Sequence, residues 1–254
     1  MTLDAAAIAP SPSLKTPTSK SRQPLDIVDL TPEQRSTLTL QVHRHTPSAP
    51  ISENVLTTFT SVINAAFHDA EHVVNFGDKQ RYPTNQLLLD DLNHGEEGAW
   101  VFLLVTAECT AVAGAKITLS GEGMDGGPGV HTRPNPDYSS PHGADQLKTF
   151  WLGALGSISP GVGRMLIDHI KAFLSKLQDG APFRIRAYTV AQWGVDPDYS
   201  IPQNASLPSW FKRQGFEVID YSWKPPGTWQ SFYGACLCAI EYVHAHSAAG
   251  GQDS

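Results

Sequence analysis

Residues 158–167 read ISPGVGRMLI and join an apolar segment to an amphipathic one. The preceding residues 150–156 (FWLGALG) are apolar and aromatic, which predicts a strand. Beyond the turn, apolar residues from Leu166 onward recur at helical spacing until Gly180, which predicts a helix. A helix that begins at Gly-x-Gly leaves backbone N–H groups free at the positive end of its dipole. The turn therefore suits either an anion such as a phosphate or a plain tight connection.

Length and composition limit the possible functions of the chain. Its 254 residues, 41% of them hydrophobic, suffice for one large domain or two small ones with a substantial core. The formal net charge of −7 argues against nucleic acid as a partner, because a phosphate backbone selects basic surfaces. The sequence has no apolar run of membrane-spanning length, and its start lacks the pattern of a secretory signal. We therefore expect a cytoplasmic protein without a membrane partner.

The three cysteines point to the same compartment. Cys109, Cys236 and Cys238 cannot form a disulfide framework, and they lack zinc-site spacing with a nearby histidine pair. Cys236 and Cys238 fall on one face of a predicted strand, where buried and inert thiols are expected. A reducing environment and no bound metal follow as expectations.

Composition divides the chain into a domain with two tails. Residues 1–35 are rich in Pro, Ser, Thr and Ala and are predicted to be a disordered tail. Residues 36–243 form the predicted domain, and residues 244–254 a short polar tail. Within the domain, residues 120–148 are rich in Gly and Pro and poor in aliphatic residues. They are expected to be a long flexible insertion, either a functional lid or a mobile loop.

Hydrophobic periodicity predicts an alternation of strands and helices. The predicted strands cover residues 37–45, 99–107, 111–119, 150–156, 182–191, 216–223 and 233–242. The predicted helices cover residues 51–70, 84–93, 166–177 and 207–214. This order indicates an α/β fold with one mixed central sheet flanked by helices.

Three motifs resemble a known family when taken in this order. Residues 161–166 (GVGRML) look like the end of a pyrophosphate-binding motif, Arg/Gln-x-x-Gly-x-Gly/Ala. Asn204 precedes residues 210–217 (WFKRQGFE) at the spacing of the family's next motif, and residues 62–67 (VINAAF) resemble its first helix. Together they resemble the GNAT superfamily of acyl-CoA-dependent N-acyltransferases over residues 36–243.

The resemblance implies an enzyme with a GNAT-like acyl-CoA N-acyltransferase fold. Such an acyltransferase passes an acetyl group from its co-substrate acetyl-CoA to a primary amine, directly and within a ternary complex. The implied cofactor-binding residues are Ser157, Ile158, Gly161, Val162, Gly163, Arg164, Asn204 and Phe211. A backbone N–H near Ser157 or Ile158 is implied as the group that polarises the thioester carbonyl.

Two departures from the family pattern support an alternative. Ile158 stands where the family usually has Arg or Gln, and Phe211 stands where a tyrosine often protonates the departing thiolate. The alternative is a catalytically silent GNAT-fold protein that binds CoA. A dinucleotide-binding oxidoreductase fits less well, since Leu166 occupies the place of the third glycine in Gly-x-Gly-x-x-Gly.

Other positions leave the chemistry open. Gly153 and Gly156 indicate either a bulge beside the cofactor arm or close packing of a helix on the sheet. The candidates for proton transfer are Tyr188 and the cluster of His68, Asp69 and Glu71, of which Tyr188 and Glu71 are preferred. The cluster also suits a solvated helix end. Acidic residues near the first helix hint at a cationic acceptor or are ordinary surface groups. The amine and the oligomeric state stay undetermined.

Overall fold

The computed structural model describes residues 28–68, 70–95, 97–119, 129–141, 143, 146–194, 198–203 and 205–245. For Ala70 and Glu71 it describes the backbone only.

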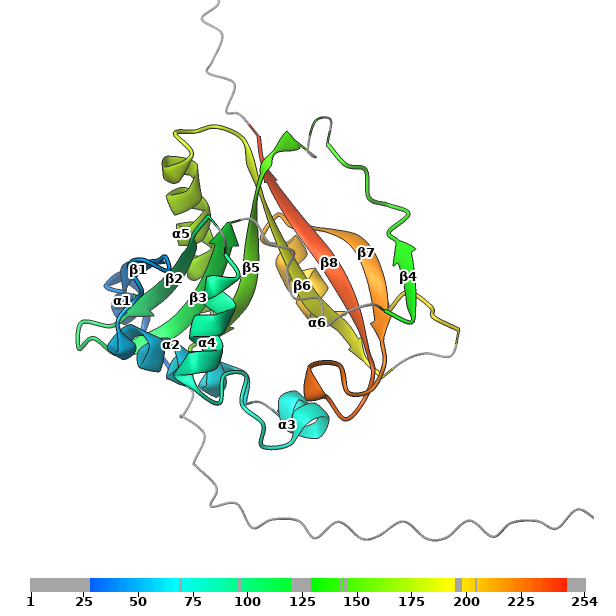
Figure 1. Cartoon of the computed structure of the whole chain (residues 1–254), viewed down its shortest axis with the longest axis horizontal. Helices are drawn as coiled ribbons and strands as arrows, with labels where there is room; N and C mark the ends of the chain where they lie inside the picture. The colour runs from blue at the N-terminus through cyan, green and yellow to red at the C-terminus, as the bar shows by residue number, and fades with distance from the viewer. Residues whose placement is uncertain are drawn as a thin grey trace, which may run out of the picture.

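A twisted mixed sheet forms the centre of this described part (Figure 1). Its strands are β1 Thr39–His45, β2 Ala99–Val105, β3 Ala111–Leu119, β4 His131–Pro134, β5 Lys148–Ser157, β6 Phe183–Trp193, β7 Glu217–Lys224 and β8 Ala235–His244. They lie in the order β1-β2-β3-β5-β6-β8-β7-β4. β5 and β6 pair in parallel, and every other neighbouring pair is antiparallel. The predicted mixed sheet is confirmed.

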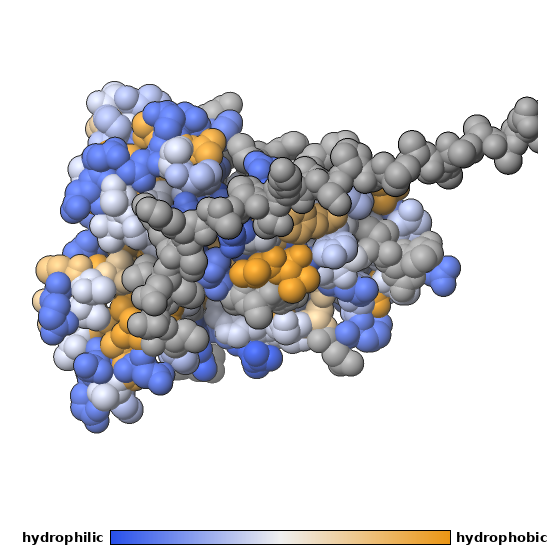
Figure 2. Space-filling model, turned by 90° about the horizontal axis from the view of Figure 1, so that it is seen from below, coloured by the Kyte–Doolittle hydropathy of each residue, from blue (hydrophilic) through white to orange (hydrophobic). Residues whose placement is uncertain are grey.

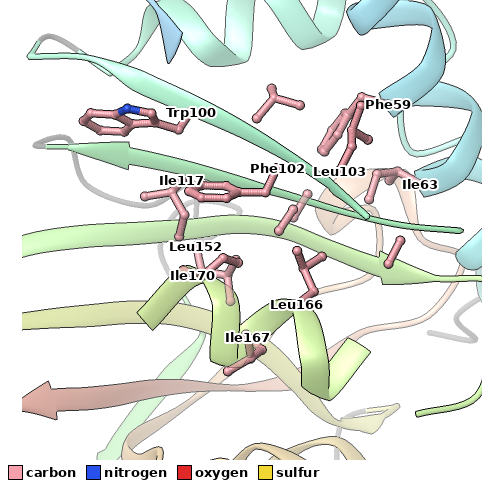
Figure 3. Close-up of a cluster of buried hydrophobic side chains, with 14 of the residues drawn as sticks. Phe59, Ile63, Trp100, Phe102, Leu103, Ile117, Leu152, Leu166, Ile167 and Ile170 are labelled. Atoms are coloured by element: carbon pink, nitrogen blue, oxygen red, sulfur yellow. The ribbon is translucent and has the colours of Figure 1, made fainter. Parts of the chain in front are cut away.

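Helices cover both faces of the sheet. They are α1 Pro32–Ser36, α2 Glu53–Ala66, α3 Ala70–Phe76, α4 Asn85–Asn93, α5 Val162–Leu177 and α6 Ser206–Lys212, with a 3-10 turn η2 Thr228–Gln230. In Figure 3, Phe59 and Ile63 of α2 lie on one side of the strands, and Leu166 and Ile170 of α5 lie on the other. The sheet is therefore the middle layer of three.

Alternation along β2 supplies side chains to both layers, which is why this strand is apolar throughout. Phe102 meets Phe173 of α5 with 5.3 Å between ring centroids. On the α2 side, a Cβ on Gly114 would lie 3.1 Å from Phe59 and Val62. Glycine at this position lets α2 lie close against β3.

A bulge at Gly153 separates β5 from β6. Lys116 of β3 pairs with Ala154, and the next residue, Ile117, pairs with Leu152, so Gly153 is an extra residue in β5. The parallel pairing with β6 runs only as far as Leu152 and Ala187. Beyond it the two strands diverge toward α3 (Figure 1). The bulge predicted at this glycine is confirmed.

Gly156 serves packing. A Cβ there would lie 2.8 Å from the Cβ of Ala66 and 3.2 Å from Ile63, both in α2. The close packing of a helix on the sheet at Gly156 therefore involves α2.

The prediction of a disordered N-terminal tail over residues 1–35 is partly wrong. Thr31 and Gln34 form a capping box that starts α1 within residues expected to be disordered. The Val28 N–H donates to the carbonyl of Ile158 over 2.9 Å, and Leu30 is buried. The prediction of disorder rested on local composition, which carries no information about contacts with distant residues. Residues 1–27 lie outside the described part of the chain.

The predicted insertion is also partly wrong. Residues 131–134 form β4, which pairs with β7 and extends the sheet. The Asn135 side chain donates to the Val218 carbonyl over 2.7 Å, and the Tyr138 hydroxyl donates to the buried Glu241 over 2.6 Å. The flexible-loop prediction for residues 120–128 falls outside the described residues.

Candidate functional site

A cleft of about 510 Å³ lies where β5 and β6 stop pairing. Its walls come from the diverging ends of both strands, from the turn before α5, and from α6. Side chains near α3, from α4 and from the loop between β7 and β8 close its far end. Clefts at the carboxyl ends of parallel strands are common ligand sites in α/β sheets.

The near end of the cleft is the glycine turn. Gly161 has a φ of +80° and is the N-cap of the 16-residue helix α5. Gly163 lines the cleft, and a Cβ there would lie 3.6 Å from Trp210 and 3.8 Å from Ser157, which is ordinary contact. The open first turn and the helix dipole give this end a positive potential.

Most of the predicted cofactor residues line this end. Ser157, Gly161, Gly163, Arg164 and Phe211 are all in the cleft wall. Phe211 is also packed edge-on against Trp210, with ring centroids 4.8 Å apart. Asn204 lies outside the described residues.

Two of the predicted cofactor residues, Ile158 and Val162, do not line the cleft. The Ile158 N–H points away from the cleft and donates to the Val112 carbonyl of β3 over 2.9 Å. Val162 is buried, and its N–H lies 3.3 Å from the Ser159 carbonyl. Neither residue is part of the cleft wall, because the turn folds their side chains into the core.

Alternation along β5 identifies the backbone donors that face the opening. In an antiparallel ladder, successive residues direct their N–H groups to opposite edges. Since Ile158 bonds to β3, the N–H groups of Ser157 and Leu155 face the edge that β6 has left. Of the two candidates for polarising a carbonyl, Ser157 is the one with the suitable direction.

Arg35 of α1 lies beside the glycine turn. A Cβ on Gly161 would be 3.7 Å from Nη1 of Arg35. The Nε atom of Arg35 is buried and has no hydrogen-bond partner among the described residues. This arginine brings a positive charge next to the turn at which Ile158 supplies none.

The far end of the cleft is aromatic. Tyr188 of β6 lines it and stacks on Trp151 of β5, with ring centroids 5.8 Å apart and planes at 17°. Trp193, Phe76 and Trp229 complete this wall. The side chain of the other proton-transfer candidate, Glu71, lies outside the described part. Figure 2 views the molecule from the α3 side and shows apolar residues among polar ones on this face.

A buried polar group forms the floor beside the bulge. Nζ of Lys116 lies 2.5 Å from Oδ2 of Asp91, and the Tyr82 hydroxyl donates to the same carboxylate over 2.7 Å. Burial by itself would raise the pKa of Asp91, but the Lys116 ammonium beside it holds that pKa below its ordinary value. Burial next to Asp91 also raises the pKa of Tyr82.

Arg81 adds a second cation at this floor. It approaches the Gly153 carbonyl at 3.5 Å, and its guanidinium carbon lies 5.9 Å from the centroid of the Trp229 ring. Sequence reasoning missed Arg81, Asp91 and Lys116. The available signal was the single lysine within the apolar segment AVAGAKITL of β3, since a buried lysine needs an anionic partner.

No group of three or more metal-ligating side chains occurs among the described residues. His72, from the histidine cluster noted in the sequence, bonds through Nε2 to the Lys79 carbonyl over 2.8 Å. The thiols of Cys236 and Cys238 are buried and unpaired, as expected, and burial raises the pKa of Cys236 to about 12. Among the described helices, none combines the length and hydropathy that a membrane span needs.

No protein-family model and no curated protein sequence matches the chain. Solved structures are similar at low sequence identity. A GNAT superfamily phosphinothricin acetyltransferase from Sinorhizobium meliloti, in complex with AcCoA, is 10% identical, with a TM-score of 0.48; the match covers 84% of this chain and 92% of that one. A spermidine N-acetyltransferase from Vibrio cholerae is 8% identical, with a TM-score of 0.46, over 82% and 95%. An Acinetobacter baylyi protein described as a putative acetyltransferase is 8% identical, with a TM-score of 0.46, over 86% and 99%.

Proposed function

We propose that the chain is an N-acyltransferase that passes an acetyl group from acetyl-CoA to a primary amine. The observation that carries this proposal is the cleft between β5 and β6, which has a helix N-terminus at one end and unpaired strand edge along its side. A long thin ligand with phosphates at one end suits this arrangement. The proposed compartment is the cytoplasm, where unpaired cysteines stay reduced.

The two halves of the cleft suit the two halves of such a co-substrate. The pyrophosphate would bind the N–H groups at Gly163 and Arg164. The pantetheine arm would lie along β5 in place of the missing partner strand and use the N–H of Ser157. The Leu155 N–H, which faces the same edge and lies nearer the bulge at Gly153, would then stabilise negative charge on the thioester oxygen during attack.

The reaction needs a neutral amine and a leaving group that can accept a proton. The amine nitrogen forms a bond to the carbonyl carbon, the C–S bond breaks, and the thiolate of CoA leaves. The nitrogen gives up one proton to a base or to water, and the thiolate takes up one proton, so that the products are an amide and the free CoA thiol. Tyr188 is our proton-transfer candidate, because it lines the far half and Phe211 has no hydroxyl.

Turnover separates this proposal from its alternative. Wild-type protein with acetyl-CoA and a panel of primary amines should release free CoA thiol, and N-acetyl product should appear in the mass spectrum. Binding of acetyl-CoA without release of CoA thiol in the presence of any amine would favour the alternative, a catalytically silent CoA-binding protein. The lack of a hydroxyl at Phe211 supports that alternative. Absence of both binding and turnover would contradict both functions.

Arg35 should strengthen acetyl-CoA binding. Charged hydrogen bonds contribute about 1.5–3 kcal/mol, so Arg35→Met is expected to weaken binding at least about tenfold. Because its Nε has no partner in the part of the chain that the structure describes, the free energy of unfolding should change by less than about 0.5 kcal/mol. Titration calorimetry and urea unfolding measure the two effects. Arg133→Met, at an exposed arginine of β4, is the control, and equal affinity in both variants would contradict the role of Arg35.

A further inference from the structure

The far half of the cleft, where the amine acceptor would bind, carries a surplus of positive charge. Among the lining residues that the structure describes, Asp91 is the single carboxylate, and it is bonded to both Lys116 and Tyr82. Arg81 and Lys116 contribute two positive charges against the one negative charge of Asp91, which leaves +1 on this floor. No carboxylate whose side chain is described forms an ion pair with Arg81.

The Arg81 guanidinium rests against aromatic rings, and only some of its hydrogen-bond donors are used within the described part of the protein. Two ring faces support it, since its carbon lies 5.8 Å from the centroid of Tyr82 and 5.9 Å from that of Trp229. Its polar contacts with described residues are the long one to the Gly153 carbonyl, at 3.5 Å, and a hydrogen bond to the Tyr82 hydroxyl. A stacked guanidinium keeps its in-plane donors available for a planar, bidentate anion such as a carboxylate.

We propose that the acceptor is an amine that carries a carboxylate close to its nitrogen, and that Arg81 binds this carboxylate. The inference rests on the proposed acyl transfer. Arg81 contacts β5 at the bulge, where the strand opening begins and where the thioester would lie. If the carboxylate of the acceptor binds there, its amine can reach the thioester only when amine and carboxylate are separated by a few bonds, as in an α-amino acid.

The surplus charge also favours the chemistry. A positive surrounding lowers the pKa of a bound amine and so increases the neutral, nucleophilic fraction. It disfavours polyamines, which would bring further positive charges to Arg81 and Lys116. The aromatic wall of Trp151, Tyr188 and Trp193 suits an apolar side chain on the acceptor.

Pairs of acceptors that differ only in charge provide the test. Each L-amino acid is compared with its amide, beginning with L-phenylalanine and L-phenylalaninamide, and spermidine is included as a cationic amine. Release of CoA thiol gives kcat/KM for every acceptor. Wild type should prefer at least one amino acid over its amide, and over spermidine, by at least about tenfold.

Variants assign that preference to Arg81. Arg81→Gln should bring the ratio of acid to amide close to one, and Arg81→Lys should retain part of it. Arg133→Gln, on β4, should leave it unchanged. Calorimetry with acetyl-CoA on the same samples should give equal affinities for wild type and Arg81→Gln, which shows that the variant is folded.

Different results would contradict the carboxylate inference and the proposed acyl transfer. If acetyl-CoA binds but amides or spermidine react as well as the acids, if no amino acid is acetylated, or if Arg81→Gln keeps the ratio, the carboxylate inference is wrong. If wild type binds no acetyl-CoA, the proposed function itself is wrong.

Discussion

Gly163→Asp is expected to abolish acetyl-CoA binding while the protein stays fully folded. The new carboxylate would stand in the first turn of α5, where the pyrophosphate is proposed to bind. Placing like charges together costs several kcal/mol, so affinity should fall by at least about a thousandfold, or ~4 kcal/mol. The Cβ itself fits, since its nearest neighbours would be 3.6 Å and 3.8 Å away.

Stability should move in the opposite direction. An acidic residue in the first turn of a helix complements the dipole, so the free energy of unfolding should rise by about 0.3–1 kcal/mol. Replacing glycine within a helix adds to this gain. Loss of binding together with equal or greater stability would be difficult to attribute to misfolding.

Ser52→Asp is the matched control. Ser52 is the exposed N-cap of α2 and makes no side-chain capping bond, so aspartate adds the same charge at another helix start. Calorimetric titration with acetyl-CoA should show unchanged affinity for this control. Wild-type affinity in Gly163→Asp would mean that the phosphates bind elsewhere.

The second large effect concerns the ion pair on the cleft floor. Lys116→Met leaves the Asp91 carboxylate buried beside Tyr82 without its cation. Breaking one partner of a buried pair costs about 3–5 kcal/mol, so the variant should lose that much stability at pH 7. Urea unfolding followed by tryptophan fluorescence measures the loss.

The loss should depend on pH in a defined direction. In wild type the pKa of Asp91 is lowered, so its contribution to stability is present above the unfolded pKa and is lost as pH falls through the folded value. In Lys116→Met, burial without the cation raises that pKa, so protonation stabilises the folded variant at acid pH. The difference between the two proteins should therefore grow as pH rises from about 4 to 7.

A double variant checks the cause. Lys116→Met combined with Asp91→Asn removes both charges and keeps a hydrogen-bond acceptor for Tyr82, so it should be more stable than Lys116→Met alone. A loss below about 1 kcal/mol in Lys116→Met, independent of pH, would show that the pair does not stabilise this floor.

Local sequence predicted the elements whose patterns are local. The short apolar segments of β2 and β3 and the helical spacing in α5 placed those elements within a few residues of their observed ends. Gly153 was correctly associated with a bulge. The predictions failed where partners are distant: the segment before α1 donates from Val28 to the Ile158 carbonyl, and β4 pairs with β7, whereas their own residues are polar or proline-rich.

The residues of the site also fall into a part that could be predicted from local sequence and a part that could not. The glycine turn is contiguous in sequence, so its residues could be named, although the direction of the Ile158 N–H depends on its contact with Val112 of β3. The floor of the cleft joins Tyr82 and Asp91 to Lys116, 25 or more positions further along. Each is unremarkable by itself, and only the fold brings them together.

Hydrogen–deuterium exchange with and without acetyl-CoA tests the central claim most directly, because it reports both whether the co-substrate binds and where. Saturating acetyl-CoA should slow amide exchange at residues 153–157 and 161–165, the strand edge and helix start that line the cleft. Exchange in β7, on the far side of β8, should stay the same. Unchanged exchange at both segments, or slowing confined to other parts of the sheet, would contradict an acyl-CoA site between β5 and β6.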